Sequence, residues 1–322
     1  MKRIASLLWA FMALSMVELA AQTAPTLPAR EALAHPENTA VARVTPRSAL
    51  LCYPSREQME VGTKSDFALP LTSWQADTLA HGIRYTSKFK RNYRYDDKEV
   101  ILRVEGATGA VSIDVNDKEI GYSASGIGRL EFDLTKHLVE NNNTISITVH
   151  RDYVAREIEP ATDGSLTFTR ATILTPPRVA VADYIAKTSF NKQGDGLLNL
   201  GIVMQSFLLN SKDYTIYYEL YSPEGKMVSS ANKELTTRML SRDTVSFFAR
   251  IPAVERWSPS TPNLYRLVVY TRHENRIKEF TTSHIGFRTV AMNEGEVVVN
   301  DEVVTIKGAP LAYTSEEQTT SD

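Results

Sequence analysis

Two pairs of carboxylates are the residues of this chain whose types and spacing could most readily do chemistry. Asp96 and Asp97 are adjacent, and Glu157 and Glu159 are separated by a single residue. Two acidic side chains held at one site can act as general acid and general base. Neighbouring carboxylates are more often solvated charges in loops, and we expect that of both pairs. The sequence therefore predicts no catalytic residue.

Signatures for metals, cofactors and nucleic acids are missing. The six histidines are scattered and have neither the H-x-x-x-H spacing nor the carboxylates of a metal site. Gly126 and Gly128 form a lone glycine pair without the context of a phosphate-binding loop. The formal net charge is only −2, and no basic stripe suggests a nucleic acid. We expect no metal, no cofactor and no nucleic-acid partner.

Aromatic and polar side chains that could hold a ligand occur in two places. Tyr122, Ser123 and Arg129 bring an aromatic ring, a hydroxyl and a guanidinium close together in sequence, a combination typical of small-molecule sites. The alternative, which we favour, is that Tyr122 packs in the core and Arg129 caps a strand edge. The second group consists of four tyrosines: Tyr214, Tyr217, Tyr218 and Tyr221. Tyr217 and Tyr221 would share one face of a strand. Packing in the core is the explanation that we favour.

The elements that position the first group are strands. Val111, Ile113 and Val115 alternate with polar residues, which predicts a half-buried strand over residues 110–116. Asn116 and Asp117 form the turn of a hairpin whose second strand begins at residue 118. Residues 123–128 are small and Gly-rich and predict a loop, and residues 129–134 predict the next strand.

Several segments carry a resemblance to a known family. Residues 115–134 are similar to the V-N-G-K-x-V-G-x-S hairpin and x-F-D-I-T strand in the sugar-binding jelly roll of glycoside hydrolase family 2, the β-galactosidase and β-glucuronidase family. Residues 257–265 match its W-S-P-x-x-P-x-L-Y segment, and residues 285–290 match h-G-F-R-x-h. The hairpin from Glu296 to Lys307, with a turn at Asn300 and Asp301, resembles the one that leads into the family's barrel. The resemblance covers about Ile83 to Gly308.

The resemblance implies an all-β fold with two sandwiches. We expect a jelly-roll, galactose-binding-like domain over residues 49–177 and an immunoglobulin-like β-sandwich of seven short strands over residues 178–290. Pro176 and Pro177 mark the boundary, because two prolines cannot continue a sheet interior. Residues 291–322 form a β-hairpin and a polar tail where the family's barrel would begin.

The family's chemistry has no counterpart in this sequence. Its two catalytic glutamates are carried by the barrel, and its jelly roll adds a loop whose aligned stretch here is residues 151–165. That stretch lacks the loop's tryptophans, its Gln-Asp and its Ser-Gly-Ile-x-Arg. Asp152 and Asp163 remain as weak ligand-binding candidates. We expect that the isolated protein does not hydrolyse aryl β-galactosides or β-glucuronides.

The N-terminus predicts export. Residues 1–21 have a basic start, an apolar run too short to span a membrane and a small-residue end, which is typical of a signal peptide cleaved after Ala21. Residues 22–48 are interpreted as a mobile leader. The expected location is the periplasm, the cell envelope or the extracellular space, with no transmembrane segment after cleavage. Cys52 is the only cysteine, so no internal disulfide can form, and we expect it to be buried.

Two functions of different classes stay open. The first is an exported, non-catalytic protein that binds a glycan or takes part in an assembly. The second is a truncated or split β-galactosidase-like enzyme of carbohydrate metabolism. The polar residues 314–322 favour the first, because they have the composition of a finished terminus. The apolar hairpin from Glu296 to Lys307 would then contact another protein, a second copy or the chain's own tail.

Overall fold

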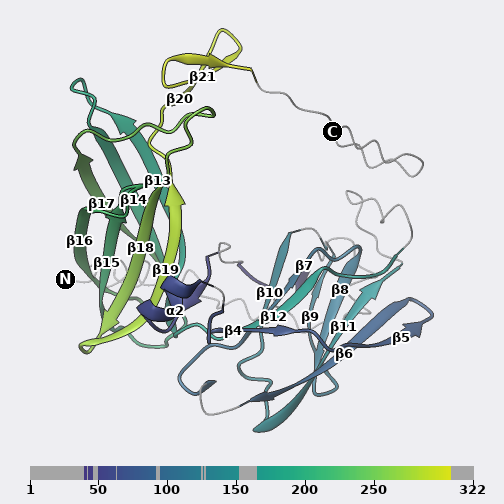
Figure 1. Ribbon diagram of the computed structural model, residues 1–322. Coiled ribbons are helices and arrows are strands. Elements are labelled where there is room, and N and C mark those ends of the chain that lie inside the picture. Colours follow the sequence, from purple (N-terminus) through teal and green to yellow (C-terminus); the bar gives the residue numbers. More distant parts are fainter. Residues whose placement is uncertain are drawn as a thin grey trace, which may run out of the picture.

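The computed structural model describes residues 40–41, 43–45, 50–62, 64–91, 95–124, 126, 128–151 and 165–305 (Figure 1). The predicted signal peptide, most of the leader, the polar tail, Asp152, Asp163 and the pair Glu157 and Glu159 lie outside these residues. The described residues form β-strands and one short helix, and every pairing between named strands is antiparallel. The predicted all-β sandwich fold is confirmed. None of the described helices is of a length and hydropathy that would cross a membrane.

The first sandwich is built from a six-stranded and a five-stranded sheet. The larger sheet contains, in spatial order, β1 (Ala40–Val41), β9 (Lys118–Ser123), β8 (Ala110–Val115), β11 (Asn141–His150), β6 (Gly82–Arg91) and β5 (Gln75–Leu79). The smaller sheet contains β2 (Arg43–Val44), β10 (Arg129–Asp133), β7 (Ile101–Glu105), β12 (Arg170–Leu174) and β4 (Ala68–Leu71). The predicted inward residues Val111, Ile113 and Val115 lie in the hydrophobic core between the sheets.

The predicted hairpin turn between β8 and β9 is confirmed by its backbone. Asn116 and Asp117 have φ angles of 51° and 62°, both in the left-handed region. A type I′ turn needs positive φ at both central residues, and Asn and Asp tolerate it better than most side chains. The Asn116 side chain also binds the backbone N–H of Thr144 on β11, at 3.0 Å, and so ties the turn to the neighbouring strand.

The second sandwich packs a three-stranded sheet against a five-stranded sheet. The first contains β13 (Val179–Phe190), β14 (Gly196–Ser206) and β17 (Arg242–Ile251). The second contains β16 (Met227–Thr236), β15 (Asp213–Tyr221), β18 (Tyr265–His273), β19 (Arg276–Ile285) and β3 (Cys52–Tyr53). Buried residues alternate with half-buried ones along β14 and β15 and with exposed ones along most of β17, as expected for strands with one face on a core.

Residues 52–61 belong to the second sandwich, which corrects the assignment of residues 49–177 to the jelly roll at this point. β3 pairs with the edge strand β19, and α2 (Arg56–Val61) follows it (Figure 1). Ser55 caps α2 by accepting a hydrogen bond from the backbone N–H of Gln58, and Gly62 ends it with a φ of 70°. Met59 packs into a small cluster of buried residues on β3, β18 and β19: Tyr53, Val268 and Phe280. We call residues 52–61 the strap.

A third, three-stranded sheet follows the second sandwich. It consists of β20 (Val290–Asn293), β21 (Glu296–Val299) and β22 (Glu302–Val304), which pair in sequence order. The predicted turn at Asn300 and Asp301 joins β21 to β22, with φ angles of 51° and 69°. Figure 1 shows this sheet at the end of the second sandwich that is remote from the strap. We call it the meander.

Candidate functional site

The aromatic ring of the first candidate ligand group, Tyr122, is buried on the outer face of the first sandwich. Tyr122 of β9 lies directly opposite Ser112 of β8, and side chains of opposite residues share a face of the sheet. Ser112 alternates with the core residues Val111 and Ile113, so Tyr122 points away from the core. Its side chain is nevertheless only 2% exposed. The ring therefore offers no open face to a ligand. It is buried, as the favoured alternative expects, but on the outer side of the sheet and not between the two sheets.

Polar side chains share this buried outer face. Ser112 lies opposite Thr148 of β11, and the Ser112 hydroxyl is 2.9 Å from Nε2 of His150. His150 is 4% exposed and stacks on His81 with 5.4 Å between ring centroids. Burial lowers the pKa of His150 to about 4, because the charged imidazolium would lose its hydration, and the neighbouring His81 adds to the effect. The histidine is therefore neutral at physiological pH.

The other predicted ligand residues point to different partners. Ser123 is fully buried and accepts a hydrogen bond from Nη1 of Arg43 at 3.2 Å. Arg129 donates to Glu105 at 3.3 Å, and Arg170 donates to the other oxygen of the same carboxylate at 2.7 Å. The structure thus uses Arg129 in an ion-pair network across β7, β10 and β12, close to the predicted alternative of a strand-edge contact. It does not assemble an open site from Tyr122, Ser123 and Arg129.

The carboxylate pair that the structure describes has the geometry of loop charges. Asp97 has a φ of 57°, and Asp96 lies 3.5 Å from Arg91 with a side chain that is 67% exposed. Among the described residues no group of three or more His, Cys, Asp or Glu could hold a metal ion.

The predicted tyrosine group is divided between the two faces of β15. Tyr214 and Tyr218 are buried in the core of the second sandwich. Tyr217 and Tyr221 lie on the outer face, where Tyr217 stacks on Tyr270 with 4.5 Å between ring centroids and 4° between the planes. Arginines cover these rings: Arg272 lies over Tyr217, and Arg56 of the strap lies over Tyr270. The expectation of core packing holds for only half of the group.

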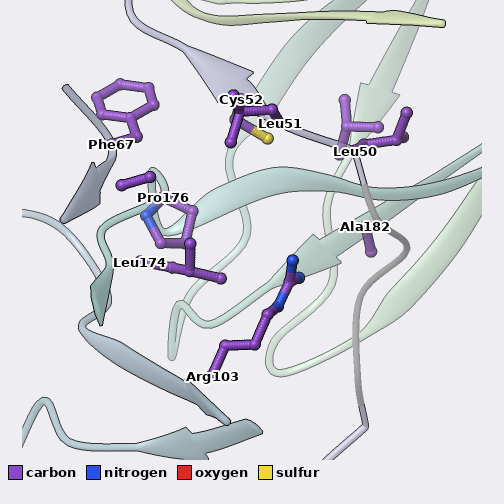
Figure 2. A pocket seen from close by; sticks show the side chains of 10 residues that line it. Leu50, Leu51, Cys52, Phe67, Arg103, Leu174, Pro176 and Ala182 are labelled. Atoms are coloured by element: carbon purple, nitrogen blue, oxygen red, sulfur yellow. The ribbon is translucent and has the colours of Figure 1, made fainter. Parts of the chain in front are cut away.

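A small cavity lies at the seam between the two sandwiches (Figure 2). It measures about 20 Å³, room for a water molecule. Its lining includes residues of β3, β4, β7, β12 and β13 and of the segment 175–178 between the sandwiches, which we call the linker. Arg103 extends toward it between Leu174 and Ala182, and its Nε donates to the buried Glu131 at 2.8 Å. Cys52 also lines the cavity and is half-buried, not buried as predicted. The sequence analysis missed Arg103, whose signal is its charge at an outward position of a strand.

The meander exposes three large apolar side chains. Val290, Met292 and Val303 are 61%, 70% and 59% exposed. One residue anchors this sheet to the second sandwich: Asn300 donates from Nδ2 to the backbone oxygen of Trp257 at 2.8 Å and accepts from the N–H of Thr289 at 3.0 Å.

Comparisons with known proteins agree with this architecture. The family model for glycosyl hydrolases family 2 matches residues 179–288, which is the second sandwich up to the meander. The β-galactosidase of Priestia megaterium is 26% identical over 230 residues, which are 70% of this chain and 22% of that protein. The β-galactosidase large subunit of Leuconostoc lactis is 23% identical over 228 residues, 70% of this chain and 35% of that protein.

Solved structures show the same fold. A β-glucuronidase of Bacteroides uniformis superposes with a TM-score of 0.60 at 18% identity, covering 69% of this chain and 28% of that one. A glycosyl hydrolase family 2 member from Bacteroides cellulosilyticus gives a TM-score of 0.61 at 15% identity, covering 72% and 32%. The chain thus spans between about a fifth and a third of each of these four relatives. The family model, the β-galactosidase relatives and these structures together support a member of glycosyl hydrolase family 2, of which this chain covers only a fragment.

Proposed function

We propose that this chain is a non-catalytic module of the family that assembles with another protein through the meander. The observation that carries the proposal is the exposure of Val290, Met292 and Val303 on a sheet of only three strands. Apolar side chains gathered on an exposed surface usually mark a site of protein contact.

The pattern of the meander supports a surface that is covered on both sides. Across the strands, Met292 lies opposite Val297 and Val297 opposite Val304, so these residues share one face. On the other face Ala291 lies opposite Val298 and Val298 opposite Val303. An antiparallel sheet with one wet face normally alternates apolar and polar residues. Apolar residues on both faces are expected where both faces are buried.

The contacts that fix the meander to the second sandwich also favour a role as an interface. Val299 is 9% exposed, and the two hydrogen bonds of the Asn300 side chain fix the turn against Trp257. Trp257 is held in turn between Arg288, 4.4 Å from its ring centroid, and Gly286, where a Cβ atom would come within 2.8 Å of the tryptophan. A fixed sheet loses little conformational freedom when it docks, which favours binding.

Glycan binding through Tyr122 has less support, because that ring is buried. A second candidate function is a component of a β-galactosidase-like enzyme whose barrel resides on another polypeptide. The chain matches 22% of the Priestia megaterium enzyme, and the Leuconostoc lactis relative is named a large subunit. In that case the meander would contact the polypeptide that carries the barrel.

The test replaces exposed apolar residues of the meander with charge. A Met292→Asp, Val303→Asp double variant, one change on each face, should abolish association of the full-length protein in multi-angle light scattering and in pull-downs from its source. The control is Leu209→Asp, because Leu209 is 74% exposed and lies in a loop of the second sandwich.

Three outcomes separate the hypotheses. Loss of a self-association or of a captured partner in the double variant alone supports the assembly function. Capture of a barrel polypeptide together with hydrolysis of aryl β-galactosides supports the enzyme component instead. A monomer that captures nothing, before and after the change, contradicts both.

A further inference from the structure

A second, larger hollow lies between the two sandwiches and shares no lining residue with the loop around Tyr122. Its volume is about 700 Å³. The first sandwich contributes Phe67 and Lys98, the linker contributes Arg178, and the second sandwich contributes Lys212 and Lys278. Tyr214, His273 and the carboxylates of Asp66, Asp97 and Glu274 also line it. We call this hollow the seam cleft.

The ammonium groups of the seam cleft lack acidic partners. Lys98, Lys212 and Lys278 have no carboxylate oxygen within 4.0 Å of the ammonium nitrogen among the described residues. Arginines elsewhere do form such ion pairs, for example Arg266 with Glu60. Arg178 is different, because it lies 3.6 Å from Glu99. With Arg178 the lining carries four cations against three carboxylates, Asp66, Asp97 and Glu274, so an excess of positive charge faces the hollow and attracts anions.

Lys98 is the most constrained of the three lysines. Its Nζ atom lies 4.2 Å from the centre of the buried Phe67 ring, a cation–π contact that fixes the direction of the side chain. Lys98 is half-buried, and this burial lowers the pKa of its ammonium group; Lys278 acts in the same direction, whereas Glu279 and Asp97 partly offset the effect. A partly desolvated cation without an ion pair regains free energy when an anion reaches it.

Two of the three acidic residues of the cleft have partners of their own, and the third, Asp97, acts on Lys98. Asp66 accepts a hydrogen bond from Nε2 of Gln58 at 2.9 Å. Glu274 lies 3.6 Å from His273, whose Nδ1 atom is 2.7 Å from the carbonyl oxygen of Asp213. His273 also stacks on Tyr214 with 4.7 Å between ring centroids, so one wall of the cleft is aromatic.

We propose that the seam cleft is a binding site for an anionic organic ligand, whose carboxylate or sulfate oxygens contact Lys98, Lys212 and Lys278. The volume falls within the range of about 300–1,000 Å³ that holds small organic molecules, so the ligand has a body and is not a bare ion. The aromatic wall at His273 suits an apolar or ring-shaped body. This site is independent of assembly through the meander.

The test uses a sulfated and a uronate disaccharide as probes, with the uncharged disaccharide lactose as the reference, in isothermal titration calorimetry on the full-length protein. We expect saturable binding of at least one anionic probe that weakens with added salt, and no binding of lactose. The two anionic probes distinguish sulfate from carboxylate as the recognised group. Lys98→Met keeps the length of the side chain over Phe67 and should weaken binding about tenfold or more, as should Lys278→Met.

The control is Lys226→Met, because Lys226 is an exposed lysine in a turn remote from the cleft lining. It should leave binding unchanged, and a thermal melt should show that all three variants are folded. Equal weakening by Lys226→Met, binding of lactose as tight as that of the anionic probes, or no binding of either anionic probe at millimolar concentration would overturn the proposal.

Discussion

The two sandwiches treat the outer faces of their larger sheets differently. In the first sandwich the outer face carries Tyr122, Ser112 and His150, and all three are less than 9% exposed. In the second the outer face carries Tyr217 and Tyr270, which stay half-exposed under arginines and the strap. At these three residues the first face is dry and neutral, although Arg84 and Asp114 carry charge elsewhere on it. The second face is wet and contains charged groups. Strand alternation determines which face a side chain occupies, but not whether that face is covered.

Protonation of His150 should destabilise the first sandwich at low pH, and this is the largest effect that we expect. The pKa of His150 is lowered from 6.5 to about 4 in the folded protein, so the unfolded chain binds more protons between these values. The contribution to stability is complete above pH 6.5 and is lost as the pH falls toward 4. The difference of roughly 2.5 pH units corresponds to about 3 kcal/mol of unfolding free energy. Urea denaturation at a series of pH values measures it.

His150→Gln is the matched variant, since an amide can still reach Ser112 but does not titrate in this range. At pH 7 the free energy of unfolding of the variant should be equal to that of the natural protein or lower. As the pH falls to 4.5, only the natural protein loses the contribution of His150, so the difference should shrink or reverse. Parallel stability curves for the two proteins would show that the outer face of the first sandwich admits water to His150.

The strap covers part of the outer face of the second sandwich. Met59→Ala should weaken the packing of the strap on that face. Met59 is 3% exposed and packs against Tyr53, Val268 and Phe280. Removal of a buried methionine side chain costs about 2–3 kcal/mol in such a site, at the low end for core methionines because the helix can shift. Val61→Ala on the same helix is the control, because Val61 is 65% exposed. A urea midpoint that falls equally in both variants would mean that the strap does not stabilise the sandwich.

The strap also shows where the sequence was insufficient. Long alternating strands such as β14 and the hairpin of β8 and β9 could be predicted, because period and turn residues are local signals. β3 contains two residues and α2 six, too few for either period, and their place is determined by contacts with β19, more than 200 positions later.

The candidate site depended on the same kind of non-local information. Tyr122 was singled out by its type and its position after a hairpin, and the structure buries it. Lys98 and Lys278 are 180 positions apart and carry no motif, yet both line the seam cleft. Only the packing of one sandwich against the other places them together, so no local pattern could have indicated that site.

Glu219→Gln is expected to have the smallest effect, and it probes the wet face directly. The Glu219 carboxylate accepts from Nη2 of Arg56 at 2.8 Å and from the Tyr221 hydroxyl at 2.7 Å. Because the Arg56 side chain is 38% exposed, water screens the ion pair, and its loss should cost only about 0.5–1 kcal/mol. Glu234→Gln on the neighbouring strand β16 is the control, because Glu234 is exposed and has no such partner among the described residues.

A second measurement shows whether the contacts of Glu219 form in solution even if their loss costs little stability. Burial and then the hydrogen bond to Glu219 raise the pKa of Tyr221, because both favour the neutral phenol. In Glu219→Gln the negative charge is gone, so the pKa of Tyr221 should move down toward its usual value even though stability barely changes. Carbon NMR of ring-labelled tyrosine measures it, with Tyr221→Phe to assign one signal among the 14 tyrosines. An unmoved Tyr221 pKa would show that Glu219 faces water in solution, and the strap would then be held by Met59 and the pairing of β3 with β19 alone.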